Sequence, residues 1–298
     1  MSDRKMYLKF YDSVGEFFEG THRVSKGQFD NKLKGENKLI AVRCATCKNG
    51  FHGNHEELYQ KWKRHDVKKE ARIMSGVLSE INTADFDEHK WEFKQRLEEG
   101  DVIDVNRYLD GNERYWSGVR RTMRTKQVVR IYFNIGGNCT KTSTQLAVSG
   151  ALAVTLTEVL ESMGIGVELW ACAFSTGVGR TRKGKQIADC GTLIKLKESD
   201  EFSDLGIINY TCGNANVFRN QMFISFCQLA EENGIECDSA LGRHREANAS
   251  DIGLTEDEEN NAIFVPSFYE VEDAKEWLKN MFTNMKETLG KTKKKDND

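Results

Sequence analysis

The sequence predicts an α/β fold in which strands and helices alternate through an open sheet with helices on both faces. In the second half of the 298-residue chain, an apolar and β-branched segment at 128–133 is followed by a helical pattern at 142–163 and a strand pattern at 166–174. A long helix between two strands implies parallel pairing and a right-handed crossover. The first 125 residues instead combine charged and aromatic side chains with short helical patterns. They predict an N-terminal mainly helical α+β region.

The composition limits the classes of protein to which the chain can belong. Lysine and arginine number 43 against 46 aspartate and glutamate, and the net charge of −3 gives no overall attraction to nucleic acid or membranes. Hydrophobic residues make up 39% and charged residues 30%, which is typical of a globular chain. No apolar run is long enough to span a membrane, and the first residues lack the apolar core of a signal peptide. We therefore expect a cytoplasmic protein whose eight cysteines are reduced thiols.

Short elements are expected in the first 125 residues. The apolar segment at 39–42 predicts a strand. Apolar side chains four residues apart place one helix over Leu58 and Trp62 and another over 73–81. A further short helix is predicted over 91–97.

The alternation of strands and helices continues after residue 174. The expected elements, in order, are a strand at 191–197 at an edge of the sheet, an amphipathic helix at 217–232, a short strand at 235–237, a buried strand at 262–265 and a final helix at 271–289. The Gly- and Ser/Thr-rich segment 175–185 predicts a mobile loop. We divide the chain into the region 1–125, a domain at 126–290 and a basic tail at 291–298.

The segment 128–174 resembles the opening of a von Willebrand factor A-like domain. It contains a strand, a loop, a long helix with the motif GALAV and a second strand that begins GVE. Together with DVIDVNRYLDGNERYW at 101–116 and VFRNQMF at 217–223, it resembles an uncharacterised family of tailed-phage proteins with a degenerate A-like domain. The resemblance implies a von Willebrand factor A-like doubly wound sheet over about 126–290. It also implies a phage-encoded protein in the cytoplasm of the host cell.

The resemblance also implies where a metal ion would lie. A functional A-like domain holds Mg²⁺ with an Asp-x-Ser-x-Ser motif after its first strand, and a carboxylate of the partner completes the coordination. The matching positions here are Asn134, Gly136 and Asn138, so the carboxylate is absent. Neutral amide oxygens offer no formal charge to offset the dehydration of Mg²⁺. We therefore expect the ion to have been lost.

The loops at the ends of the strands remain the best candidate for a binding surface. The residue types between 134 and 143 by themselves favour a loop that caps the following helix. Ligands of open α/β sheets nevertheless bind beyond the carboxyl ends of the strands, so we expect loops 134–143, 175–185 and 211–216 to engage a protein partner or another copy of the chain. The predicted partner-binding residues are Asn134, Gly136, Asn138, Thr140, Thr142, Ser143, Ser175 and Thr176.

A second candidate site has the spacing of zinc ligands. Cys44, Cys47, His52 and His55 form a C-x2-C-x4-H-x2-H pattern, in which two thiolates and two imidazoles could bind Zn²⁺ tetrahedrally. The alternative is a hairpin or loop with reduced cysteines, in which His55 begins a helix. The sequence favours this alternative and predicts no other cofactor.

A basic patch supports an alternative function, the binding of RNA or single-stranded DNA. Arginine and aromatic side chains together suit phosphate pairing and base stacking. The residues are Tyr115, Trp116, Arg120, Arg121, Arg124, Lys126, Arg180, Arg182 and Lys183. An ordinary solvated face, whose charges meet the acidic cluster at 256–259, explains the same pattern and is favoured.

Motifs of catalysis are missing from the sequence. It contains no GxSxG, HExxH or GxxxxGK[ST] motif. We therefore expect a non-enzymatic binding or assembly protein.

Overall fold

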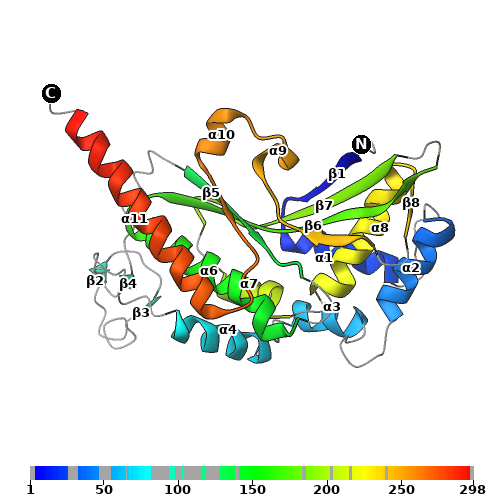
Figure 1. Cartoon of the computed structure of the whole chain (residues 1–298). Coiled ribbons are helices and arrows are strands. Elements are labelled where there is room, and N and C mark those ends of the chain that lie inside the picture. Colours follow the sequence, from blue (N-terminus) through cyan, green and yellow to red (C-terminus); the bar gives the residue numbers. More distant parts are fainter. Residues whose placement is uncertain are drawn as a thin grey trace.

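A computed structural model shows one large mixed sheet packed against helices (Figure 1). It describes residues 4–25, 33–46, 55–64, 66, 68–81, 94–97, 102–103, 116–118, 128–137, 141–182, 186–201, 204–214, 217–238 and 241–295. The expected α/β class is confirmed at this level. The finer assignment, a von Willebrand factor A-like domain, stays a prediction.

Five strands form the main path of the seven-stranded sheet. Their order is β1 (Arg4–Tyr11), β7 (Ile187–Lys197), β6 (Gly166–Thr181), β5 (Val128–Asn134) and β10 (Ala262–Val265). β1 runs parallel to β7, while β5 runs parallel to both β6 and β10. β6 and β7 pair antiparallel, and the short strands β8 (Ile235–Cys237) and β9 (Arg243–Arg245) pair antiparallel with β6. A separate antiparallel sheet contains β2 (Lys94–Leu97), β4 (Trp116–Gly118) and β3 (Val102–Ile103).

The longer helices gather on one face of the sheet (Figure 1). They are α1 (Val14–Ser25), α2 (Gly35–Thr46), α3 (His55–Lys63), α4 (Lys68–Glu80), α6 (Ser143–Ser162), α7 (Leu205–Gly213), the π-helical η2 (Val217–Met222), α8 (Phe223–Glu232) and α11 (Val271–Lys295). We call this side the helical face. The opposite face carries two short helices, α9 (Ala249–Ile252) and α10 (Glu256–Asn260). Helices therefore lie on both faces, as expected, but unequally. On the sparsely covered face Tyr132 and Trp170 pack against Leu254 rather than against a long helix.

The helix between β5 and β6 is the centre of the core. α6 is apolar around most of its circumference, and Leu152 and Leu156 are fully buried. Thr142 caps its first turn, because its side chain accepts from the backbone N–H of Gln145. Among the described residues, this is the one helix long and apolar enough to cross a membrane, but 72% of it is buried within the protein. Such burial is what a core helix of a globular fold requires.

Several predicted elements are confirmed. Helices cover Leu58 and Trp62, 73–80 and 143–162, and strands cover 128–133 and 262–265. The short strand at 235–237 and the helical stretch from 217 to 232 are also present, although the latter begins as a π-helix. The six cysteines that the structure describes are free thiols.

The strand expected at 39–42 is wrong, because these residues lie in helix α2. Asn37, Ile40 and Ala41 are buried, whereas Leu39 is 63% exposed. Burial at spacings of three and four residues belongs to a helix with one face on the core. α2 packs this face against α8, and the four apolar residues at 39–42 do not indicate this contact in the sequence.

The helix predicted over 91–97 is also wrong in its described part, since Lys94–Leu97 forms strand β2 and pairs with β4. Residues 91–93 lie outside the described residues. Pairing with a distant strand overrides the local helical spacing here.

Strand β7 is not at an edge of the sheet, contrary to the prediction. It lies between β6 and β1, and β1 pairs with it along its whole length from Arg4 to Tyr11. The first strand of the chain therefore belongs to the same sheet as the last. Phe17 and Phe18 of α1 also share one core cluster with Ile131 of β5. The division after residue 125 stays a prediction, but the described residues on its two sides share a sheet and a core.

The segment 175–181, expected as the start of a mobile loop, instead extends strand β6. Gly179 and Arg180 pair with β7 on one side and with β8 on the other. Gly179 has a steric role, because a Cβ atom there would overlap the backbone carbonyl of Glu236. Glycine thus allows the close approach of two strands rather than a loop.

A buried ion pair lies where β7 ends beside the start of β6. The ammonium of Lys197, at the end of β7, lies 2.8 Å from Oε1 of Glu161 in α6, and both side chains are almost completely buried. Lys197 also donates to the carbonyls of Val167 and Glu198, at 3.0 and 2.7 Å. One side chain thereby joins β6, β7 and α6.

Replacement of Lys197 tests this junction. We expect Lys197→Met to lower the free energy of unfolding by about 3–5 kcal/mol, because the carboxylate of Glu161 stays buried without its cation. Denaturant titration at neutral pH measures the loss. The double variant Lys197→Met/Glu161→Leu should recover most of it. A matched control is Lys275→Met, which breaks the exposed pair with Glu272 and should cost no more than about 1 kcal/mol. Equal losses in Lys197→Met and in the double variant would contradict the pairing.

Candidate functional site

The carboxyl ends of β5, β6 and β10 point to the same side of the sheet, because these strands run in the same direction. The chain leaves β5 through α6 towards β6, whereas β10 lies on the other side of β5. In open α/β sheets such a reversal of strand order leaves a crevice where ligands bind. We call the residues 134–137, 175–177 and 266–270 at this edge the rim.

A strand from later in the chain closes the rim. Asn134, the last residue of β5, pairs with Cys172, but β6 continues for nine residues beyond that position. β9 pairs with β6 at Phe174–Thr176, on the side that β5 has just left. The amide of Asn134 donates to the carbonyl of Arg245 in β9 at 3.1 Å, and its oxygen accepts from the N–H of Gly136 at 2.7 Å. The side chain at the first predicted ligand position therefore ties β5 to β9.

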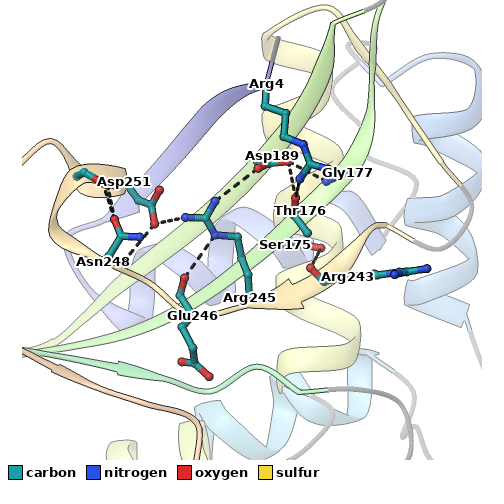
Figure 2. Close-up of polar contacts among 11 residues, drawn as sticks. Arg4, Ser175, Thr176, Gly177, Asp189, Arg243, Arg245, Glu246, Asn248 and Asp251 are labelled. Carbon is teal, nitrogen blue, oxygen red and sulfur yellow. Dashed lines mark hydrogen bonds and ion pairs between the residues drawn. The ribbon is translucent and has the colours of Figure 1, made fainter. Parts of the chain in front are cut away.

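A polar network fixes β9 to β6 and β7 (Figure 2). Its centre is Asp189 of β7, which is 4% exposed. Asp189 accepts from the hydroxyl of Thr176 at 2.9 Å and from the N–H of Gly177 at 2.8 Å, and its other oxygen lies 3.5 Å from the guanidinium of Arg245. Arg245 also pairs with Asp251 of α9. One buried carboxylate of β7 thus contacts both β6 and β9.

The two hydroxyl residues predicted in the second loop are both used in this network. Ser175 donates to the carbonyls of Leu241 and Arg243, at 2.6 and 3.3 Å. Thr176 accepts from Arg4 at 2.6 Å while it donates to Asp189. Both hydroxyl groups thus donate their protons within the chain, and the oxygen of Thr176 also accepts from Arg4.

A histidine occupies the space beside the second predicted ligand position. A Cβ atom on Gly136 would lie 2.6 Å from Nδ1 of His244, so a side chain there would collide with the ring. Nε2 of His244 lies 3.0 Å from the hydroxyl of Ser267 and 3.7 Å from the carboxylate of Glu246. Burial alone would raise the pKa of Glu246, but the nearby imidazole of His244 and the hydrogen bonds that Ser267 donates outweigh it and hold this pKa below its ordinary value.

A second group of contacts anchors the start of α6. Arg219 of η2, only 6% exposed, donates to the carbonyl of Lys141 at 2.5 Å. The ammonium of Lys141 lies 4.0 Å from the ring centre of Tyr269, which follows β10. Arg219 of the motif VFRNQMF, part of the family resemblance, thus fixes Lys141 just before α6.

The predicted partner-binding residues are brought together only in part. Asn134 and Ser175 both contact β9, and Thr142 is the N-cap of α6, so the capping interpretation is confirmed at that residue. Asn138 and Thr140 lie outside the described residues.

Sequence reasoning missed Asp189, Arg245 and Ser267. The motif GRHRE around His244 was the available signal, but its partner Ser267 is 23 residues away.

The predicted zinc site is only partly described. Cys44 is half-buried in helix α2 rather than in a loop, and His55 begins helix α3, as the alternative to zinc requires. Cys47 and His52 fall in ranges that the structure does not describe. Within the described ranges, no group of three His, Cys, Asp or Glu residues could hold a metal ion. Zinc at the full motif stays a prediction.

Two members of the basic patch have described side chains. Arg182 forms two hydrogen bonds with Glu231, at 2.9 and 3.1 Å, whereas Arg180 is exposed. Arg130, which lies in the same basic stretch of the sequence but opposite Glu168 near the start of β6, pairs with Glu258 at 3.0 Å, so the predicted meeting with the acidic cluster is confirmed for this one residue. Trp116 lies in β4, and the side chains of Tyr115, Arg120, Arg121, Arg124, Lys126 and Lys183 are outside the described residues.

Fold and rim together define a mixed α/β protein whose carboxyl edge is closed by its own polar side chains. The chain belongs to the family described as Domain of unknown function (DUF7192), whose model matches residues 2–293. No curated protein and no solved structure matches it. The resemblances to tailed-phage proteins and to A-like domains stay expectations.

Asn134 offers a test of how the rim is held. Asn134→Asp removes the N–H that donates to Arg245 and places a buried carboxylate against a carbonyl. We expect the free energy of unfolding to fall by about 1–3 kcal/mol. Denaturation with and without Mg²⁺ measures the effect, and Mg²⁺ should not restore the loss.

The control for this test makes the same chemical change on an exposed helix surface. Asn280→Asp in α11 should alter stability by less than about 0.5 kcal/mol. An Asn134→Asp protein that Mg²⁺ stabilises selectively would show that the rim still accepts a cation.

Proposed function

We propose that this protein is a non-enzymatic binding or assembly protein that engages a protein partner, or another copy of itself, through the rim. The proposal includes a degenerate von Willebrand factor A-like domain at 126–290. It also includes a phage-encoded origin and a place in the cytoplasm of the host cell, both of which rest on the sequence resemblance.

The observation that carries the proposal is the internal use of the rim's polar atoms. The side chains of Asn134, Ser175 and Thr176 all form hydrogen bonds within the chain. Catalysis and ion binding need polar groups that are left available to a ligand, whereas a protein partner can bind a surface whose polar groups are already paired within the chain. A rim tied to β9 and Asp189 offers such a surface.

The strand order gives further support to the A-like interpretation. β7, β6, β5 and β10 follow one another across the sheet, β7 is antiparallel to β6, and α6 connects β5 with β6. This agrees with the strand, loop, long helix and strand that the resemblance implied. The binding surface of an A-like domain would fall at the rim.

Exposed charges around the rim are available to a partner. Arg243 of β9 points away from the polar network in Figure 2. Glu270, which follows β10, is exposed and makes one long hydrogen bond of 3.3 Å with Gln145. Charged residues at the border of an interface govern the rate and specificity of association more than the fold.

Charge reversal at these two positions tests the proposal. Wild type, Arg243→Glu and Glu270→Lys are immobilised as full chains and used to capture proteins from a lysate of the native host, with quantification by mass spectrometry. We expect a partner retained by wild type to fall by about tenfold or more with either variant, because these charges border the contact.

A matched control keeps the test specific. Asp200→Lys makes the same change as Glu270→Lys, but beyond the end of β7, at the opposite edge of the sheet. The partner should be retained by this variant as by wild type. If no protein distinguishes the rim variants from Asp200→Lys, the rim is not the binding surface.

Binding of RNA or single-stranded DNA is the second candidate function. The exposed side chain of Arg180 favours it, although Arg182 is engaged by Glu231. Fluorescence anisotropy with labelled oligo-uridine and oligo-thymidine should show affinity that falls steeply from about 50 to 200 mM salt. At the same salt concentration, Arg180→Glu should bind the oligonucleotides more weakly than the wild type. Undetectable binding at low salt would exclude this function.

A further inference from the structure

Strand β1 ends the large sheet with an open edge. β7 is the one described strand that pairs with it, and this pairing uses all eight residues from Arg4 to Tyr11 without a register shift. β1 contains no proline and no bulge, two of the devices that protect an edge from pairing with another strand, but it carries a third device, the charged side chains of Arg4, Lys5 and Lys9. The backbone on its outer side is therefore suited to accept a further strand whose side chains suit these charges.

The side chains of β1 form two different rows. Met6, Leu8 and Phe10 point to the face opposite the helical face, where Met6 and Leu8 pack on the cluster around Trp170. Phe10 is 46% exposed, although its ring lies 6.2 Å from that of Trp170 in an edge-on arrangement. One exposed aromatic ring thus lies beside the open edge, where an added strand could cover it.

The sequence of β1 is complementary to itself in one antiparallel register. If Leu8 lies opposite Leu8 of a second copy, Met6 lies opposite Phe10. The basic residue Arg4 then lies opposite Asp12, which is exposed just after the strand. Apolar side chains thus meet apolar ones, and opposite charges meet.

The same register also separates the remaining basic residues. Lys5 lies opposite Tyr11, and Lys9 lies opposite Tyr7, while Lys9 is already paired with Glu232 at 2.6 Å. A register centred on Tyr7 would instead place Lys5 opposite Lys9, and one centred on Lys9 would oppose two Lys9 side chains. Like charges directly opposite each other destabilise a strand pair.

We infer that this protein forms a symmetric dimer in which the β1 strands of two copies pair antiparallel about Leu8, so that their sheets become one continuous sheet. The pairing supplies backbone partners on the side of β1 where no described strand pairs, and it covers Phe10 with Met6 of the other copy. This interface uses the backbone edge of β1 rather than the rim, although Arg4 of β1 donates to Thr176 of the rim, so it goes beyond the proposed function.

Cysteine crosslinking tests the register directly. Full chains with Leu8→Cys, Tyr7→Cys or Lys9→Cys are oxidised with copper phenanthroline and analysed on non-reducing gels beside the wild type, which reports any crosslinking by native cysteines. We expect a covalent dimer with Leu8→Cys alone, because residue 8 is the one position that faces itself. Crosslinking of Tyr7→Cys or Lys9→Cys instead would contradict the register.

A second measurement does not depend on the packing of Leu8. Size-exclusion chromatography with light scattering should show a dimer for the wild type at micromolar concentration, and Phe10→Lys should raise the dissociation constant by about tenfold or more. Val128→Lys introduces the same side chain at another exposed apolar position, 40% exposed at the start of β5, and should leave the dimer intact. A wild-type monomer, or equal loss in both variants, would overturn the proposal.

Discussion

The length of β6 is the constraint on which the rest of the structure depends. β5 ends opposite Cys172, and the part of β6 beyond that point would expose unpaired backbone groups on that side. Unpaired backbone groups in a protein interior are costly, so a second partner is required. β9 pairs at Phe174–Thr176 and β8 pairs at Gly179–Thr181. The chain therefore completes its own sheet with β8 and β9, two short strands that follow α8 in the sequence.

The position of β9 has a direct consequence for the rim. Successive residues of a strand point to opposite faces, so the side chains of His244 and Arg245 contact different groups of residues. His244 lies against Gly136 and Ser267, while Arg245 faces Asp189 and Asp251. One strand of three residues thus fills the crevice at the end of β5 and holds the network beyond it. A cation would have to displace these contacts before it could reach Asn134.

The sequence predicts those parts of the fold that depend on local periodicity. The apolar pattern of α6 and the β-branched run of β5 identify both elements, because each is buried on nearly all sides. β1 could not be found in the same way, since RKMYLKFY becomes a strand through pairing with β7, more than 180 residues away. The contact of His244 with Ser267 is hidden for the same reason. The absence of a carboxylate at Asn134 was readable in the sequence, but the use of its amide to hold β9 was not.

The backbone groups at the rim and those at the outer side of β1 are satisfied in different ways. At the rim, side chains and a returning strand satisfy the polar groups within the chain, and the result is a surface of fixed shape. At β1, the side chains instead alternate between basic and aromatic residues on one face and apolar residues on the other, and the outer backbone keeps its capacity for pairing. Positive charge on Arg4, Lys5 and Lys9 opposes the addition of most strands, because a partner must place acidic or aromatic groups opposite each of them. The same charges therefore disfavour the registers that place Lys5 opposite Lys9 or Lys9 opposite itself, and they oppose the edge-to-edge association to which an uncharged strand would be exposed.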